Sequence, residues 1–524
     1  MTEVALPSSS NSALCLLLFR NIFLFIIIFL LFLSFPFIAC IKYNETDIKK
    51  WLTNNYDIFI YAVLGFATMI LLNHLSKNSS CWYDEIFSLG WIYGDPPDGK
   101  NYIYLFLLNL WVKIMPYGQE YLWLLTEIFI FGTIIIAGLI GRNIKDKSLG
   151  ILLSTLIATS STVYSQCIQL RPYGMILFFS SLMLYFFIKK QQCLNNPKYN
   201  TIILYSISIV ATMDCHDFGI AVAGLLMIFD LILILKKKAS TRYLIEFILP
   251  SIYGVYYLLT RFITHIGMAE KFGWIVSPTI NNTIDIIIKE SGGTTFNFIL
   301  LILGVFLIIA QLVYVIQNKQ FNYNNDFIML VVLSVPLLTI GFEIVYSVII
   351  NPNMSLHVDR YFTPIIIFLT VIIGMSLHKI IEFILSSFKK LYTLPLVLSI
   401  MISMCTINWR TYQAFNFQNY REVADYVMSQ NDTYLDSTAF VITGDYHLND
   451  GITYYTTHKG KRDDIKHFSV NRLPENIYEY ETIYYCYLHS YISVHPDFYE
   501  HLSSEYTMVE NDSKNKLAKF IKNK

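Results

Sequence analysis

Residues 79–97 read SSCWYDEIFSLGWIYGDPP and directly follow an apolar run at about 57–75. Within this stretch Asp84 and Glu85 form an acidic pair between aromatic residues. Ionisable groups beside a membrane-length segment are costly unless they face water, a cavity or a partner. The pair therefore marks a candidate functional site at the edge of a membrane, provided that the rest of the chain spans one.

The whole chain has the composition of a polytopic helical membrane protein. Of its 524 residues 55% are hydrophobic and 15% charged, whereas soluble proteins have about a quarter charged residues. Segments such as 296–316 are apolar all round and approach the roughly 20 residues that a helix needs to cross a bilayer. The 38 basic residues match the 38 acidic ones, so no basic field favours nucleic acid.

The positions of lysine and arginine predict which connections share a side of the membrane. These residues gather in alternate connections, which the positive-inside rule places in the cytoplasm. The remaining connections, among them 77–119 and 261–295, then lie outside together with the polar tail after about residue 409. The segment 102–115 is short for a span and predicts a helix at the interface. The candidate spans lie at about 14–38, 57–75, 120–141, 149–165, 173–188, 201–214, 217–235, 243–260, 296–316, 327–349, 361–378 and 392–408.

The sequence predicts three parts. Residues 1–56 form an extra N-terminal membrane helix with a cytoplasmic connection, and residues 57–409 form a transmembrane catalytic domain. Residues 410–524 form a small extracytoplasmic α/β domain, since NYREVADYVMSQ has helical spacing while TAFVITGDY and YETIYYCYLH are typical of strands.

Polar residues embedded in apolar sequence gather in the outer connections. Their convergence on one rim favours a site for an anionic, lipid-linked substrate. Each residue alone has a structural alternative: the acidic pair can be solvated, the arginines can extend to lipid headgroups, and Glu343 inside a span can pair structurally. The residues are Asp84 and Glu85, then Gln169, Arg171 and Tyr173 in QLRPYG, His216 and Asp217 in DCHDFG, Lys271 in the 261–295 loop, and His357, Asp359 and Arg360 in LHVDRYF.

Four segments resemble, in order, the GT-C membrane glycosyltransferases: WYDEIFSLGW, YSQCIQLRPYGMILFFSSLMLYFF, HDFGIAVAGLLMIFDLI and HVDRYFTPIIIFLTVIIGMSL. They are similar to the branch with protein O-mannosyltransferases and bacterial aminoarabinose transferases, over about residues 57–430. The resemblance implies an all-α polytopic membrane fold of about 11–13 transmembrane helices with a small outer domain. It also implies transfer of a sugar, with inversion, from a polyprenyl-phosphate carrier to an acceptor on the outer side of the membrane.

The chain departs from the family pattern at two motifs, and its extra N-terminal helix falls outside the usual core of the family. DGKNYIYLF stands where relatives often carry a His-Pro-Pro-type element, and Glu127 lies in the span where they often carry an arginine. These departures bear on the acceptor and on the phosphate contacts.

Chemistry assigns a role to each candidate residue. A carboxylate beside an apolar rim can have its pKa raised toward that of a general base, so we assign Asp84 to the acceptor hydroxyl. Adjacent helical side chains point in different directions, which leaves Glu85 to orient the loop or the acceptor. Arginine presents a fork of donors that fits phosphate oxygens, so we assign the phosphate first to Arg360 and then to Arg171 and Lys271. The remaining substrate-binding candidates are Tyr173, His216, Asp217 and His357.

The partners follow from this scheme. They are a polyprenyl-phosphate sugar donor, an acceptor that is a lipid, a glycan or a protein, and the bilayer itself. We expect an integral protein of a bacterial inner membrane with its site facing the periplasm. The eight cysteines show no zinc-ligand spacing, so no metal site is predicted, while His216 and Asp217 leave a divalent cation open. The alternatives are a flippase or transporter for lipid-linked sugars, a polysaccharide polymerase or ligase, and a non-catalytic scaffold.

Overall fold

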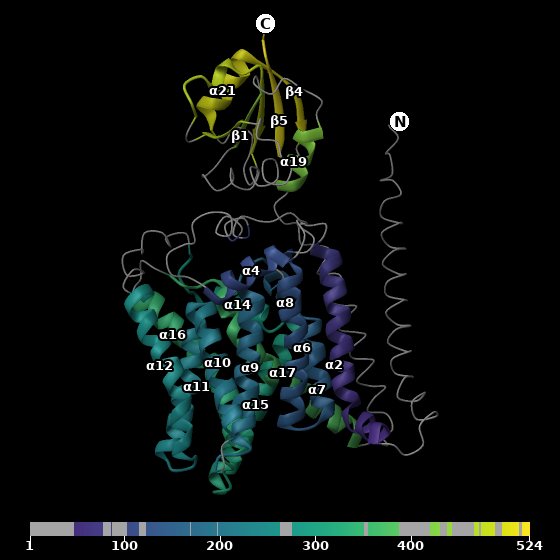
Figure 1. The fold of residues 1–524 in the computed structure, drawn as a ribbon, viewed down its shortest axis with the longest axis vertical. Helices are drawn as coiled ribbons and strands as arrows, with labels where there is room; N and C mark the ends of the chain where they lie inside the picture. Colours follow the sequence, from purple (N-terminus) through teal and green to yellow (C-terminus); the bar gives the residue numbers. More distant parts are fainter. Residues whose placement is uncertain are drawn as a thin grey trace.

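The structure is a computed structural model of the 524-residue chain. It describes residues 47–76, 85, 88, 102–114, 122–167, 169–195, 198–262, 275–350, 355–386, 420–429, 438–442, 466–470, 473–487, 495–512 and 516–523. The predicted spans at about 14–38 and 392–408 lie outside these residues. A bundle of long helices makes up most of the described chain, and a small sheet domain lies beyond one end of it (Figure 1).

In the described part of the chain, eight helices are long and apolar enough to cross a membrane. A ninth arises if α7 and α8, which meet at 52°, count as one span. The multi-pass helical membrane architecture is thereby confirmed. The spans are formed by α2 (Asp47–Ser76), α6 (Leu124–Ile144), α9 (Tyr173–Gln191), α11 (Asp217–Leu235), η1 with α12 and η2 (Thr241–Phe247, Ile248–Tyr257, Leu258–Phe262), α15 (Thr295–Gln317), α16 with η4 (Asn325–Val345, Tyr346–Ile350) and η5 with α17 (Asp359–Ile365, Ile366–Ser386); the bent pair is α7 (Lys147–Ala158) and α8 (Ser161–Cys167).

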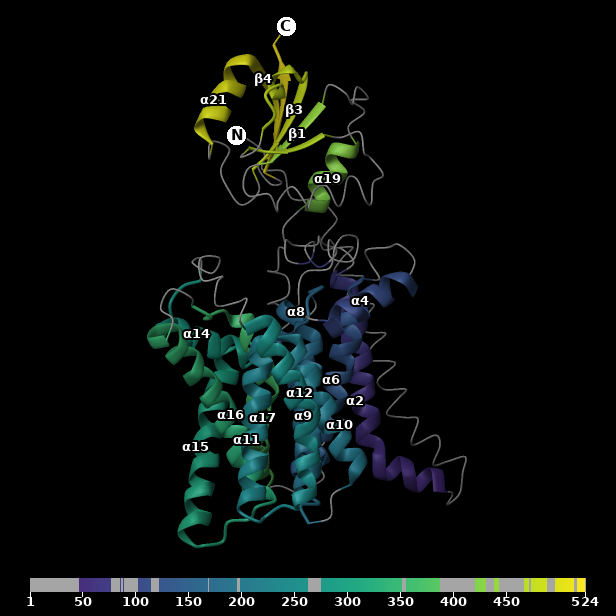
Figure 2. The same cartoon turned by 60° about the vertical axis from the view of Figure 1, so that its left-hand side comes forward.

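Three further helices complete the bundle. α10 (Tyr199–Cys215) is 17 residues long and packs between α9 and α11. α4 (Tyr102–Ile114) and α14 (Ile280–Glu290) lie at the end of the bundle that is nearer to the sheet domain (Figure 2). α4 confirms the short helix that the sequence predicts at 102–115. We refer to this end of the bundle as the α4 end.

Small residues allow α6 and α7 to pack closely. A Cβ atom added at Gly141 would lie 2.7 Å from the backbone of Gly150, and one added at Gly138 would lie 2.5 Å from Oγ of Ser154. Small residues at helix interfaces are typical of membrane bundles, where close packing replaces the hydrophobic effect between helices. On the outer helices α12 and α15, large apolar side chains such as Ile252 and Phe306 are exposed, as expected for a surface that faces lipid.

A buried charge network lies at the end opposite to the α4 end. Nζ of Lys190 on α9 lies 2.9 Å from Oδ2 of Asp230 on α11 and 2.6 Å from Oε2 of Glu246 on η1. The hydroxyl of Tyr205 donates a further hydrogen bond to Asp230 at 2.7 Å. The network therefore fastens four helical segments together, because a charge buried in a membrane protein needs a partner.

The sheet domain contains five strands in the order β2-β1-β3-β5-β4. β1 pairs in parallel with β2 and β3, whereas β5 pairs antiparallel with β3 and β4. The elements are β1 (Thr438–Ile442), β2 (Lys466–Ser469), β3 (Thr482–Cys486), β4 (Tyr506–Asp512), β5 (Leu517–Lys522), α19 (Tyr420–Ser429), α21 (Pro496–Glu505) and the short η10 (Ile477–Glu479).

The two helices of this domain cover opposite faces of the sheet. Alternate residues of a strand point to opposite faces. Ala439 and Val441 share a core with Phe498 of α21, whereas Phe440 and Ile442 share a core with Val423 of α19. All five residues of β1 are buried, as expected for a strand that is covered on both faces. The predicted α/β domain is therefore confirmed.

Candidate functional site

Glu85 fastens the first long connection to the bundle. It is 2% exposed, and its Oε1 accepts hydrogen bonds from Nε1 of Trp123 at 2.8 Å and from the backbone N–H of Leu170 at 2.7 Å. Trp123 lies directly before α6, and Leu170 lies in the QLRPYG turn before α9. This geometry supports the role of Glu85 in orienting the loop. Asp84 lies outside the described residues.

Arg171 occupies the same turn. Its Nη1 donates to Oγ of Ser88 at 3.3 Å, so residues 85 and 88 both contact the QLRPYG turn. The hydroxyl of Tyr104 on α4 is fully buried and makes no hydrogen bond with any residue that the structure describes. Burial raises the pKa of Tyr104 well above its usual value, while the charge of Arg171 lowers it and that of Glu85 raises it. An uncharged phenol therefore lies close to the guanidinium and the carboxylate.

Three aromatic rings bring three separate turns together. The ring of His216, between α10 and α11, has its centroid 6.2 Å from that of Tyr173 and 4.7 Å from that of Tyr361. Tyr173 begins α9, and Tyr361 lies in η5 next to Arg360. The sequence prediction that these turns converge is thus met for the QLRPYG, DCHDFG and LHVDRYF segments. Tyr361 itself was not among the sequence candidates.

The side chains of His216 and Asp217 in the DCHDFG turn both accept hydrogen bonds. Nδ1 of His216 accepts a hydrogen bond from the N–H of Phe218 at 3.2 Å and so caps α11. Oδ1 of Asp217 accepts from the hydroxyl of Tyr257 at 2.8 Å, and Asp217 remains exposed. Both residues are thereby oriented at the α4 end of the bundle.

The sequence reasoning missed Asp214. It is 1% exposed and accepts hydrogen bonds from the N–H of Ile103 and from the hydroxyl of Tyr253, each at 2.8 Å. Ile103 lies in the first turn of α4, where backbone N–H groups have no partner within the helix. The signal was present, because an acidic residue in the last turn of α10 opposes the helix dipole and needs a specific donor.

Arg360 lies in the first turn of η5. Its N–H donates to Oδ1 of Asp359 at 2.8 Å, and its carbonyl accepts from Oγ1 of Thr363 at 2.7 Å. Oδ2 of Asp359 pairs with Nζ of Lys289 on α14 at 3.1 Å. Arg360 is half-buried. These contacts fix the backbone of Arg360, and η5 packs against both α9 and α11.

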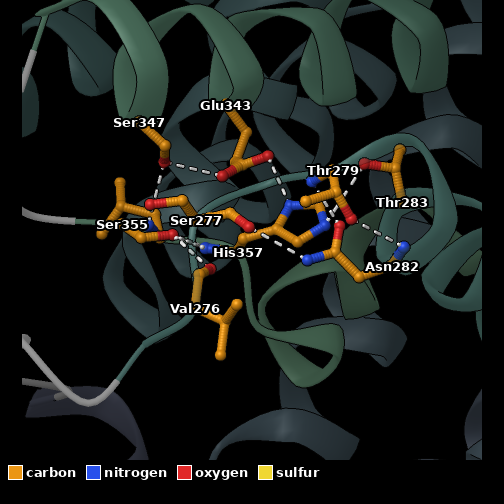
Figure 3. Close-up of polar contacts among 10 residues, drawn as sticks. Val276, Ser277, Thr279, Asn282, Thr283, Glu343, Ser347, Ser355 and His357 are labelled. Carbon is orange, nitrogen blue, oxygen red and sulfur yellow. Dashed lines mark hydrogen bonds and ion pairs between the residues drawn. The ribbon is translucent and has the colours of Figure 1, made fainter. Parts of the chain in front are cut away.

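The side chain of His357 lies in a buried polar network with residues of α14 and α16 (Figure 3). Its Nδ1 lies 2.8 Å from Oε2 of Glu343 on α16, and its Nε2 lies 3.3 Å from Oγ1 of Thr283 on α14. The hydroxyl of Ser347 donates to Glu343 at 2.7 Å. The side chain of His357 is 2% exposed. This geometry favours a structural role over substrate binding for His357, and it confirms that Glu343 pairs within the protein.

The segments on either side of this network are also tied down. Oγ of Ser355 donates to the carbonyl of Val276 at 2.9 Å, and Thr279 with Asn282 forms a capping box at the start of α14 (Figure 3). α14 is thus held in place at its first turn by His357 and beyond its last turn by the bond from Ser161 to the carbonyl of Gly292 at 3.0 Å.

Lys271 lies outside the described residues, so its predicted place at the phosphate stays a prediction. Among the residues that the structure describes, no group of three or more histidine, cysteine, aspartate or glutamate side chains has a metal-binding arrangement. A divalent cation therefore also stays a prediction.

Solved structures of similar shape include the aminoarabinose transferase ArnT of Cupriavidus metallidurans. The form bound to undecaprenyl phosphate matches with a TM-score of 0.55 and 10% sequence identity, over 89% of this chain and 98% of the other. The apo form matches with a TM-score of 0.53 and 11% identity, over 87% and 97% of the two chains. The chain has the GT-C fold.

No family model matches the sequence, and neither does any curated protein. An archaeal oligosaccharyltransferase from Archaeoglobus fulgidus matches in structure with 9% identity and a TM-score of 0.47, over 82% of this chain and 68% of the other, which is too distant to support an argument. The likeness to ArnT extends over 89% of this chain, at an identity that carries information about the fold alone.

Proposed function

We propose that the protein is a membrane glycosyltransferase that moves a sugar from a polyprenyl-phosphate donor to an acceptor hydroxyl. One observation carries the proposal: the turns with Arg171, His216 and Arg360 meet at one end of a bundle whose fold is that of ArnT. The matching ArnT structure holds undecaprenyl phosphate, which makes a phosphate on a long isoprenoid the donor carrier to test first.

The reaction needs a base and a site for the leaving phosphate. The acceptor oxygen attacks the anomeric carbon, its proton passes to Asp84, and the bond from that carbon to the phosphate oxygen breaks with its electron pair on the phosphate. Asp84 directly precedes Glu85, whose two hydrogen bonds hold this part of the loop against the QLRPYG turn. One displacement of this kind inverts the anomeric configuration.

Arg360, Arg171 and Lys271 provide the positive charge that the departing phosphate requires. Guanidinium groups match phosphate oxygens with paired hydrogen bonds, and a site with little water strengthens that attraction. Tyr173 follows Arg171 by two residues, and the ring of His216 packs against Tyr361, the residue after Arg360. Tyr173, His216 and Asp217 present ring faces and polar atoms suited to a sugar. The domain division at about 57–409 and 410–524 fits this scheme, with the α4 end of the bundle and the sheet domain on the extracytoplasmic side of a bacterial plasma membrane.

Sugar transfer from a panel of labelled polyprenyl-phosphate sugars, in membranes that contain lipid, glycan and peptide acceptors, tests the proposal. Wild type is compared with Asp84→Asn, which keeps the shape of the side chain and removes its charge. Turnover by wild type and none by the equally abundant variant support a transferase with Asp84 as its base. Movement of the labelled lipid across the membrane without transfer would favour a flippase. A parallel reaction with EDTA tests for a divalent cation.

A further inference from the structure

Glu290 is a buried carboxyl group that the sequence reasoning did not consider. It is the last residue of α14 and is 1% exposed. Its Oε1 accepts a hydrogen bond from Nε2 of Gln166 at 2.9 Å, whereas its Oε2 makes no hydrogen bond with any described residue. An ionised carboxylate with one hydrogen bond is costly to bury. Glu290 therefore fits its surroundings as a neutral acid.

The groups around Glu290 support the neutral form. Burial raises the pKa of Glu290 well above its usual value, the bond from Gln166 lowers it, the charge of Asp359 on η5 raises it again, and that of Lys289 on α14 lowers it.

A chain of side chains leads from Glu290 to Arg360. The hydroxyl of Thr363 lies 3.1 Å from Oε1 of Gln166 and 2.7 Å from the carbonyl oxygen of Arg360, so its single proton is shared between these two acceptors. Gln166 is 6% exposed and Thr363 is fully buried. Because water is excluded from these contacts, their geometry depends on each partner, and a change at Glu290 reaches the first turn of η5.

We propose that Glu290 is a positioning residue for Arg360: it holds Gln166 and Thr363, and through them it fixes the first turn of η5, from which Arg360 binds the phosphate of the lipid donor. This inference rests on the proposed function, since it assumes that Arg360 binds that phosphate. The uncharged state of Glu290 matters because Arg360 is proposed to bind an anionic phosphate. An ionised Glu290 would add a negative charge to that of Asp359 and would weaken the attraction of Arg360 for the phosphate.

Binding of undecaprenyl phosphate to the purified full-length protein tests this inference. Glu290→Gln keeps a neutral group and an acceptor for Gln166, so its Kd stays within about twofold of wild type. Glu290→Ala leaves the amide of Gln166 without its acceptor and raises the Kd about tenfold, which corresponds to the loss of one buried hydrogen bond. Glu481→Gln, at an exposed position of the sheet domain, is the matched control and leaves the Kd unchanged.

The pH dependence separates positioning from a general loss of structure. As the pH rises toward the raised pKa of Glu290, ionisation of Glu290 weakens binding in wild type, whereas Glu290→Gln binds equally well over that range. Sugar transfer by wild type and by both variants is measured on the same preparations, with thermal unfolding as a control for folding. If Glu290→Ala does not fold, the comparison of pH dependence between wild type and Glu290→Gln still tests the role of Glu290.

The outcomes distinguish this inference from the proposal on which it rests. Wild type that neither binds undecaprenyl phosphate nor transfers sugar overturns both. The role of Glu290 alone is overturned by either of two results in a series where wild type does bind. In the first, Glu290→Gln binds as weakly as Glu290→Ala. In the second, binding by Glu290→Gln has the same pH dependence as binding by wild type.

Discussion

The backbone N–H of Leu170 donates a hydrogen bond to Oε1 of Glu85 at 2.7 Å, across 85 residues of sequence. Since Nε1 of Trp123 donates to the same oxygen at 2.8 Å, one carboxylate joins the first long connection to two segments of the bundle. The residue next to Asp84 is thereby fixed beside Arg171.

Removal of the Glu85 carboxylate is expected to destabilise the protein. Glu85→Ala leaves two buried N–H groups without acceptors, which costs about 1–3 kcal/mol for each such group. The variant therefore unfolds at a lower temperature in detergent, and the fluorescence of Trp123 changes with it. Glu85→Gln keeps one acceptor oxygen and is expected to lose less than half as much. An equal melting temperature for wild type and Glu85→Ala would show that these bonds do not hold the loop.

The buried network around Lys190 predicts that a single substitution of Lys190 destabilises the protein more than removal of all three charges together. Lys190→Met leaves Asp230 and Glu246 buried together without a cation, and breaking a buried pair in this way costs about 3–5 kcal/mol. Lys190→Met combined with Asp230→Asn and Glu246→Gln removes every charge and is expected to recover most of that loss. Thermal unfolding measures both, with the neighbouring Lys189→Met as the control. A triple variant less stable than the single one would contradict this account.

The pair of His357 and Glu343 predicts coupled effects on stability rather than on substrate binding. Glu343→Gln and His357→Asn each remove one side of the 2.8 Å contact. A double-mutant cycle on the free energy of unfolding is expected to give a coupling energy of about 0.5–3 kcal/mol, as for other residues in direct contact. Additive effects, or variants of full stability that lose lipid-phosphate affinity, would instead return His357 to the substrate site.

The lowered pKa of His467 leads us to expect that the sheet domain loses stability in mild acid. Its burial in β2, with its ring centroid 5.7 Å from that of Phe440, lowers its pKa from 6.5 to about 4. The folded domain therefore disfavours the charged form. This contribution to stability is complete above the unfolded pKa and is lost as the pH falls from about 6.5 to about 4.

Limited proteolysis of the full-length protein between pH 7 and 4 measures this effect. Cleavage within the sheet domain is expected to accelerate toward pH 4 in wild type and to accelerate less in His467→Gln. The same acceleration in both proteins would assign the acid sensitivity to other groups.

Much of the fold follows from local sequence patterns. The spans, the interfacial helix α4 and the strands β1 and β3 depend on apolar length and alternation, which neighbouring residues determine. The convergence of the QLRPYG, DCHDFG and LHVDRYF turns follows from the alternation of lysine and arginine between the two sides, because that pattern places all three turns at one end.

The partners of single side chains could not be predicted in this way. Glu290 looks like the solvated end of an amphipathic helix, and only the packing of α14 against α8 and η5 shows that it is buried against Gln166. His357 precedes a candidate phosphate ligand in sequence, yet the chain turns so that its ring points to Glu343 on another helix. One hydrogen bond that Asp214 accepts comes from Ile103 on α4, which is 111 residues away in sequence, so local patterns could not reveal it.

The most direct test of the central claim is sugar transfer from labelled undecaprenyl-phosphate sugars by wild type, Arg360→Ala and the control Arg421→Ala. Arg421 lies on α19 of the sheet domain and pairs with Asp425 of the same helix at 3.6 Å. The account predicts transfer by wild type and by Arg421→Ala, and a loss of at least about tenfold in Arg360→Ala, because one charge-assisted phosphate contact contributes about 1.5–3 kcal/mol. Equal transfer by all three proteins would contradict the assignment of the donor phosphate to Arg360 and to the site at the α4 end.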